Sequence, residues 1–206
     1  MIFVFLGIQG SGKGTQAKLL SKYLGIEHVN LGEFFRQQIT EKTSLGVLVH
    51  SFISEGNLVP DELVCQIVSK LLLQKDKGFV FDGFPRTLNQ AEYMNYVHPV
   101  KRVFYLELAD NIARERMLAR RICSECGIDY NLLIRPPKKE KICDKCGGEI
   151  IKRADDTIEF IQNRLDLFHQ ETQPLTDFYQ NLGLLTVINA NNPIESIHKL
   201  IVESGV

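Results

Sequence analysis

The sequence predicts an α/β fold in which helices flank a parallel β-sheet. The chain opens with a continuous apolar run, Ile2–Leu6, that is rich in aromatic and β-branched residues, as is typical of a strand buried on both faces. Similar runs recur at residues 79–81, 103–106 and 184–188. Segments with helical periodicity separate these runs, so we expect right-handed crossovers and a parallel sheet.

The segments between the strands are expected to be helical. Apolar residues recur with helical spacing in residues 31–38, 45–54, 60–73 and about 157–179, and a further helix is expected after Pro193. Pro60 fits the first turn of its helix, where the two acidic residues that follow it suit the positive end of the helix dipole. Pro174 cannot continue a helix, so we expect the long stretch to break there.

Length and charge exclude several classes of protein. A chain of 206 residues corresponds to about one domain with small insertions. The net charge of -1 argues against a main role in coating nucleic acid or anionic lipid. The apolar start, Met1–Ile8, is far shorter than the ~20 residues of a membrane span and lacks the flanks of a signal peptide. We therefore expect a cytoplasmic protein with no nucleic-acid or membrane partner.

A glycine-rich segment lies between the first strand and the first helix. Gly7 is followed by four residues and then by Gly12 and Lys13, which is the phosphate-loop pattern in the setting that it requires. Glycines let backbone N–H groups converge on phosphate oxygens, and the next helix points its positive end at the same anion. Thr15 is the expected hydroxyl for Mg²⁺, one place later than in the plain motif because Gly14 intervenes. The pattern predicts a nucleotide site without separating kinases from hydrolases.

Four of the five cysteines fall in one short insertion, residues 122–153, that breaks the α/β rhythm. Two Cys-x2-Cys pairs separated by sixteen residues have the spacing of a zinc ribbon, and four protein ligands leave no open position, so such an ion is structural. Two disulfides or a redox pair are the alternatives. The expected ligands are Cys123, Cys126, Cys143 and Cys146. The fifth, Cys65, lies in a helical apolar pattern and is expected to be a buried, inert thiol.

Further motifs carry a resemblance to a known family. Residues 82–87 read Asp-Gly-Phe-Pro-Arg-Thr, and they occur with Gly-Lys-Gly-Thr at 12–15 and Gly-Asn-Leu-Val-Pro-Asp at 56–61. Together with the segments 120–123 and 153–156, these motifs resemble the adenylate kinases over essentially the whole chain. The cysteine-bearing insertion is similar to that of the long-lid, zinc-containing bacterial form.

The resemblance implies a reaction and an architecture. The reaction is the Mg²⁺-dependent transfer MgATP + AMP ⇌ 2 ADP by a monomer, which is mostly a matter of positioning and charge stabilisation. The implied parts are a phosphate-loop core, a helical arm that binds the nucleoside monophosphate, and a small zinc-ribbon lid that closes over ATP and excludes water. Their expected bounds are 1–29, 60–121 and 159–206 for the core, 30–59 for the arm, and 122–158 for the lid.

The resemblance also implies roles for individual residues. The implied catalytic residues are Lys13, Arg86, Arg120, Arg153 and Arg164. ATP is assigned to Gly10, Ser11, Gly12, Lys13, Gly14, Thr15, Arg116, Arg120, Asp129, Tyr130 and Asn192. AMP is assigned to Leu31, Arg36, Asn57, Leu58, Val59, Gly83, Phe84, Pro85, Arg86, Gln90, Arg153 and Arg164. Mg²⁺ would be reached through water by Thr15 and Asp82, and Asp155 and Asp156 match the acids of lid closure. Arg116 and Arg120 are four apart, so on a helix they would share one face.

Departures from the family pattern keep alternatives open. Gln9 replaces the usual proline of the loop, Glu33 replaces an aspartate, and Leu31 replaces a threonine whose hydroxyl contacts the base of AMP. The last change points to a kinase with another acceptor base as an alternative. A zinc-ribbon nucleic-acid-binding ATPase and a nucleotide sensor without turnover are the alternatives from other classes. The arginine set weighs against the sensor, because a sensor needs affinity and not transition-state charge.

Overall fold

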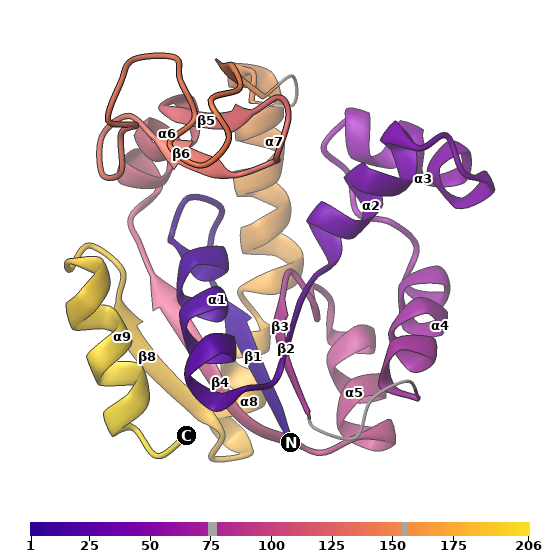
Figure 1. Ribbon diagram of the computed structural model, residues 1–206. Helices are drawn as coiled ribbons and strands as arrows, with labels where there is room; N and C mark the ends of the chain where they lie inside the picture. The colour runs from indigo at the N-terminus through magenta and orange to yellow at the C-terminus, as the bar shows by residue number, and fades with distance from the viewer. Residues whose placement is uncertain (74–77, 154–155) are drawn as a thin grey trace.

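The computed structural model describes residues 1–73, 78–153 and 156–206 (Figure 1). Its centre is a five-stranded sheet in the order β2-β3-β1-β4-β8, and every neighbouring pair is parallel. The strands are β1 Ile2–Leu6, β2 Glu27–Asn30, β3 Phe79–Asp82, β4 Val100–Glu107 and β8 Leu185–Asn189. The predicted fold class and the four predicted strands are confirmed. The edge strand β2 was not expected, because its residues are polar and half-buried and form no apolar run.

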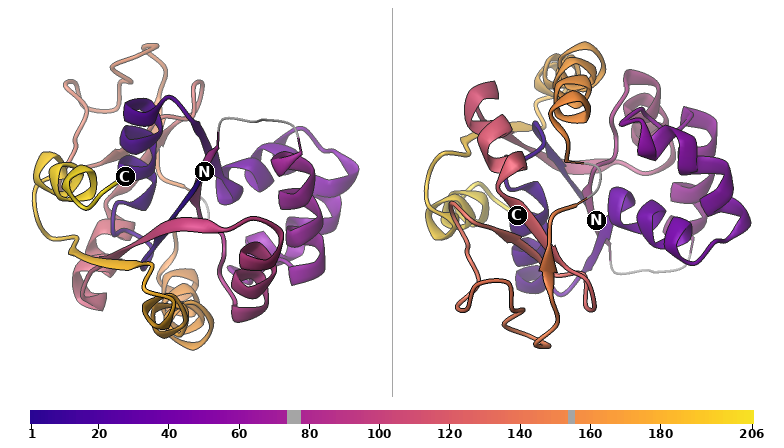
Figure 2. Two further views of the ribbon diagram at one scale, coloured as in Figure 1. Left: turned by 90° about the horizontal axis from the view of Figure 1, so that it is seen from below. Right: turned by 90° about the horizontal axis from the view of Figure 1, so that it is seen from above.

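Helices cover both faces of the sheet, as the two end-on views in Figure 2 make clear. Alternate residues of β1 belong to two separate apolar clusters, because successive side chains of a strand point to opposite faces of the sheet. Ile2 and Val4 join one cluster, whereas Phe3 and Phe5 join the other. The first cluster packs against α4 Asp61–Leu72, α5 Leu88–Val97 and α8 Leu175–Asn181, and the second against α1 Lys13–Leu24 and α9 Ile194–Glu203.

A helical arm projects beside the carboxyl end of the sheet (Figure 1). It consists of α2 Leu31–Thr40 and α3 Ser44–Ser54. Asn30 and Thr43 cap the two helices, their side chains accepting from the backbone N–H groups three residues on. A Cβ at Gly46 would lie 2.0 Å from the carbonyl oxygen of Gln38, so only glycine allows the two helices to pack this closely. The helices expected at 31–38 and 45–54 are confirmed.

A second, three-stranded antiparallel sheet forms the base of the cysteine-bearing insertion. Its order is β6-β5-β7, with β5 Arg120–Cys123, β6 Asp129–Asn131 and β7 Ile150–Ile151. The preceding helix, α6 Asp110–Leu118, ends before β5 begins. The expectation that Arg116 and Arg120 share one helical face is therefore wrong, because Arg120 pairs with Asn131 in the sheet instead of continuing the helix.

The long helical stretch near the C-terminus has an interruption. α7 Ile158–Leu167 runs into a π-helix, Phe168–Thr172, and α8 follows Pro174, so the predicted break at this proline is confirmed. Pro60 immediately precedes α4 and is extended, one position before the first turn in which it was expected. None of the helices in the described parts of the chain is long and apolar enough to span a membrane.

Candidate active site

The phosphate loop joins β1 to α1 at the carboxyl edge of the sheet. Gly7, Gly10 and Gly12 all have positive φ, which residues with a side chain rarely adopt. A Cβ at Gly7 would lie 2.6 Å from the carbonyl oxygen of Leu106, so the loop requires glycine there. Gly12 begins α1 without a side-chain cap, which leaves the first N–H groups of the helix available to an anion.

Lys13 lies over this loop. Its Nζ donates to the carbonyl oxygens of Gly7 at 2.6 Å and Ile8 at 2.9 Å. Burial lowers the pKa of Lys13 to about 8, while the nearby carboxylate of Asp82 acts in the opposite direction. Lys13 is half-buried, and its ammonium group lies beside the place where the loop would hold phosphate, so a bound anion would raise its pKa again.

Asp82 ends β3 directly opposite the start of α1. The paired register of β2 and β3 sets Asn30 beside Asp82, and the Asn30 amide donates to the carboxylate at 2.7 Å. A Cβ at Gly14 would come within 3.0 Å of the same carboxylate. Thr15 and Asp82 both line the cleft, so a hydroxyl and a carboxylate, which suit Mg²⁺, face one space beside the phosphate loop. The hydrogen bond from Asn30 to Asp82 was not predicted. The position of Asn30 just before a segment with helical periodicity did indicate a helix cap.

Positive charge lines the cleft between the loop, the arm and the insertion. The cleft has a volume of about 600 Å³, within the range of small-molecule sites. Nine cationic residues from different parts of the chain line it: Lys13, Lys18, Lys22, Arg36, Arg86, Arg120, Arg135, Arg153 and Arg164. Six of the nine were predicted from the sequence, and the structure brings these six together; Lys18, Lys22 and Arg135 were not predicted. Such a concentration of fixed positive charge suits a ligand with several phosphate groups.

The backbone of Arg86 is fixed from two sides. Its N–H donates to the side-chain oxygen of Gln90 at 2.9 Å, and its carbonyl accepts from the Thr172 hydroxyl at 2.8 Å. Its side-chain Nε donates to the carbonyl of Gly83 at 3.1 Å. Burial lowers the pKa of Arg86, although Asp82 opposes this shift. Thr172 belongs to the π-helix, and no motif in the sequence pointed to its role.

A buried carboxylate joins two of the arginines. Asp156 is fully buried and receives Nε and Nη2 of Arg120 at 2.8 and 2.5 Å, while Nη1 of Arg164 donates to it at 3.2 Å. Arg120 begins β5, the strand that leads into the insertion, and Arg164 lies on α7. The carboxylate therefore ties the base of the insertion to the core. Asp155, the second acid of the predicted pair, lies outside the described residues.

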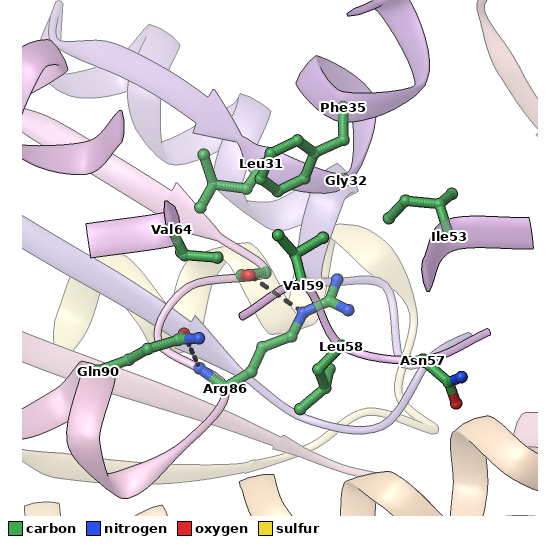
Figure 3. Close-up of a pocket in the computed structure, with 11 residues that line it drawn as sticks. Leu31, Gly32, Phe35, Ile53, Asn57, Leu58, Val59, Val64, Arg86 and Gln90 are labelled. Carbon is green, nitrogen blue, oxygen red and sulfur yellow. Dashed lines mark hydrogen bonds between the residues drawn. The ribbon is translucent and has the colours of Figure 1, made fainter. Parts of the chain in front are cut away.

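A small apolar pocket opens from the cleft at the arm (Figure 3). It shares Arg86, Asn57, Leu58 and Gly83 with the cleft. Its apolar walls come from the arm, the loop after it and α4: Leu31, Phe35, Ile53, Val59 and Val64. Gln90 contributes a polar group and is 2% exposed. The composition of this pocket, apolar walls with the amides of Asn57 and Gln90 and the guanidinium of Arg86, suits a heterocycle attached to an anion.

Several predicted residues lie outside the cleft lining. Arg116 is buried, and its guanidinium donates to the carbonyl of Ala190 at 3.0 Å and to the Asn191 side chain at 3.1 Å. Ser11 is a buried residue of the loop, Phe84 packs in the core against Phe81, and Asn192 is exposed. The other residues assigned to ATP, to the monophosphate and to Mg²⁺ line the cleft or the pocket.

The four clustered cysteines converge in the insertion. Their sulfur atoms all lie within 4.8 Å of one another, and the Cys123–Cys146 and Cys126–Cys143 pairs are 3.5 Å apart. A tetrahedral zinc ion with Zn–S bonds of about 2.3 Å needs sulfurs roughly 3.8 Å apart, so the thiols fit that ion. The cysteines are free thiols, which disagrees with the disulfide alternative. Tyr130 lines the cleft, and its hydroxyl donates to Cys143 Sγ at 3.5 Å.

Comparison with known proteins agrees with this geometry. A family model described as adenylate kinase matches residues 5–184 of the chain. The chain belongs to the adenylate kinase family. Similar curated adenylate kinases include those of Caldicellulosiruptor saccharolyticus, at 41% identity over 99% of this chain and 98% of the relative, and Bacillus subtilis, at 42% over 96% and 94%. The adenylate kinase of a Geobacillus species is 42% identical over 96% of this chain and 94% of its own. The protein is thus a phosphotransferase enzyme, and the nucleic-acid ATPase and sensor alternatives have no such support.

Proposed function

We propose that the protein transfers the γ-phosphoryl group of MgATP to AMP and yields two ADP, reversibly. The observation that carries this assignment is the single cleft in which a phosphate loop and an apolar monophosphate pocket meet across nine cationic residues. Two polyanions brought within bonding distance repel each other, and a site that joins them must offset that repulsion. A hydrolase needs only one nucleotide site, so the second pocket supports transfer between nucleotides.

The donor side is proposed to hold ATP by its phosphates. Backbone N–H groups of Gly10–Thr15 would bind the phosphate oxygens, and Lys13 would leave the carbonyls of Gly7 and Ile8 to follow the transferred group. Asp129 and Tyr130 of the insertion would lie against the rest of the nucleotide. Arg116 and Asn192 would act from beside the cleft through the loop of Ala190.

The acceptor side is proposed to hold AMP in the smaller pocket. Arg36 and Arg86 would bind its phosphate at the mouth of the pocket, and Leu31, Val59 and Gln90 would enclose its base. The backbone of residues 57–59 and of Gly83–Pro85 would complete the walls. Arg120, Arg153 and Arg164 would then neutralise the charge that spreads over the transferring phosphoryl group.

Two metal ions belong to this proposal. Mg²⁺, arriving with ATP, would neutralise phosphate charge and orient the chain of phosphates near Thr15 and Asp82. Zn²⁺ would be structural and would be held by Cys123, Cys126, Cys143 and Cys146. The insertion has only one small apolar cluster, which contains Cys123, Cys143, Tyr130 and Ile150, so a metal staple supplies stability that packing alone does not.

We also propose the division into moving parts, the monomeric state and a cytoplasmic location. The core comprises residues 1–29, 60–121 and 159–206, the arm 30–59 and the lid 122–158. The cleft is formed within one chain, which supports a monomer. Free thiols and the nucleotide substrates support a reducing, nucleotide-rich compartment.

Initial rates with different acceptors test this function. At fixed MgATP, AMP is expected to give a higher kcat/KM than GMP, CMP or UMP. Leu31 in the acceptor pocket is the observation that favours a different acceptor. A higher kcat/KM with another monophosphate would show that this nucleotide, and not AMP, is the preferred acceptor. Formation of ADP in the absence of any acceptor would show that the protein is a hydrolase and not a transferase.

A further inference from the structure

Gln90 is held by two partners that offer opposite hydrogen-bonding groups. Its Oε1 accepts from the backbone N–H of Arg86 at 2.9 Å, a bond drawn in Figure 3. Its Nε2 donates to Oδ1 of Asp61 at 2.6 Å. A backbone N–H can only donate and an ionised carboxylate can only accept. The chemistry of the partners therefore fixes which end of the amide is oxygen and which is nitrogen.

Asp61 is itself locked in place. It is the first residue of α4, and its second oxygen accepts from the Thr87 hydroxyl at 2.8 Å. The same hydroxyl caps α5 by accepting from the backbone N–H of Gln90 at 3.3 Å. Asp61, Thr87 and Gln90 thus form a closed ring of hydrogen bonds between the starts of two helices. Asp61 does not line the pocket, so it acts on a ligand only through Gln90.

A fixed amide distinguishes two classes of purine. Each end of the Gln90 amide retains one further bonding position, namely a second lone pair on Oε1 and a second hydrogen on Nε2. Adenine presents an amino group at C6 and an acceptor at N1, which complement oxygen and N–H in that order. Hypoxanthine and guanine present the reverse, an oxygen at C6 and a hydrogen on N1.

Turning the amide to suit a 6-oxopurine is costly here. The amide nitrogen would then face the N–H of Arg86, and the amide oxygen would face the carboxylate of Asp61. Both original bonds would be replaced by repulsive contacts in a site where Gln90 is 2% exposed. Such a penalty against the wrong ligand is a direct source of specificity.

We propose that Asp61 is a positioning residue that selects 6-aminopurine over 6-oxopurine acceptors by fixing the amide of Gln90. This inference rests on the proposed binding of AMP in the acceptor pocket. It assigns a specificity role to a carboxylate outside the pocket, at the N-terminus of α4.

The test compares AMP with inosine monophosphate as acceptors in the full-length enzyme. The Asp61→Ala variant is expected to lower the ratio of kcat/KM for AMP over inosine monophosphate by about tenfold. KM for AMP should rise more than kcat falls, and KM for ATP should stay constant. Asp61→Asn should retain the preference, because its amide oxygen can accept from Gln90 while its NH₂ donates to Thr87. Glu62→Ala is the matched control, since Glu62 is exposed in the same helical turn and makes the same change in charge.

The outcomes separate the inference from the function on which it rests. A wild-type enzyme without preference for AMP over inosine monophosphate would overturn the AMP assignment and this inference together. A preferring wild type whose Asp61→Ala variant keeps the same ratio would overturn the inference alone. Equal losses of activity toward both acceptors would do so as well, because they would show Asp61 to be merely structural. Melting temperatures of all variants establish that the compared enzymes are folded.

Discussion

Asp156 and Arg120 form a bidentate ion pair, with Nε and Nη2 of the guanidinium 2.8 and 2.5 Å from the two carboxylate oxygens. Bidentate pairs of this kind are the strongest side-chain hydrogen bonds because both groups are ionised and both bonds are aligned. Since Arg164 shares the carboxylate, one buried acid orients two of the arginines that we assign to phosphoryl transfer. Its removal should therefore affect both stability and catalysis.

Asp156→Asn is expected to lower the free energy of unfolding by about 1–3 kcal/mol. The substitution removes the negative charge that two largely buried guanidinium groups share, at 21% and 12% side-chain exposure. Urea denaturation measures this loss, and kcat should fall together with it. Asp177→Asn, an exposed acid on α8, is the control and should change stability by less than about 0.5 kcal/mol. Equal effects of the two substitutions would refute a structural role for the shared carboxylate.

ATP affinity should weaken above about pH 8. In the protein without nucleotide, burial lowers the pKa of Lys13 to about 8, and bound phosphates raise it again. Below this pH the lysine is charged in both states, so Kd is flat. Above it, binding must take up a proton, and Kd should rise by up to about tenfold per pH unit. Calorimetric titration with MgATP in the absence of acceptor measures this dependence.

Lys13→Arg is the matched variant for that titration, because a guanidinium stays charged throughout the range. Its Kd should be weaker at pH 7 but flat between pH 7 and pH 9. An equal rise in wild type and variant would place the titrating group elsewhere.

The purified protein should contain one zinc ion per chain, and chelation should lower its melting temperature by roughly 5 °C or more. Cys143→Ser should reduce the zinc content and lower the melting temperature in the same way. Cys65→Ser is the control, because Cys65 stands apart from the cluster and burial raises the pKa of its thiol to about 11. If Cys143→Ser leaves the zinc content and the melting temperature at wild-type values, the four cysteines do not hold a structural zinc ion.

Leu31→Thr should lower KM for AMP by about two- to tenfold. Leu31 is 2% exposed and lines the acceptor pocket, where a hydroxyl would add a hydrogen bond to the base. Leu31→Val has the same shape as the threonine variant without its hydroxyl, so it should not gain affinity. If both variants behave alike, packing and not hydrogen bonding determines the effect of this position.

The features that sequence reasoning predicted well are those encoded in continuous segments. The strand Ile2–Leu6 is apolar at every position because both of its faces are buried, and the loop after it needs glycine at positions that the backbone itself specifies. The four cysteines are predictable for the same reason, since each pair lies close together in the chain. In such cases the local pattern and the tertiary role agree.

The features that were missed depend on contacts between distant segments. Strand β2 is polar and is held in place by pairing with β3. Arg120 leaves the helical register of Arg116 because the insertion folds back to pair with it. The hydroxyl of Thr172 reaches a carbonyl 86 residues away in the chain. The sequence contains no spacing that indicates these contacts, because they arise only when the tertiary fold brings the segments together.

Product stoichiometry tests the central claim most directly. Purified protein is incubated with Mg²⁺, ATP and AMP, and the nucleotides are separated by chromatography. The account predicts two ADP formed for each AMP consumed, no ADP without AMP, and loss of the reaction in Lys13→Ala. Formation of ADP with release of inorganic phosphate and without consumption of AMP would contradict it.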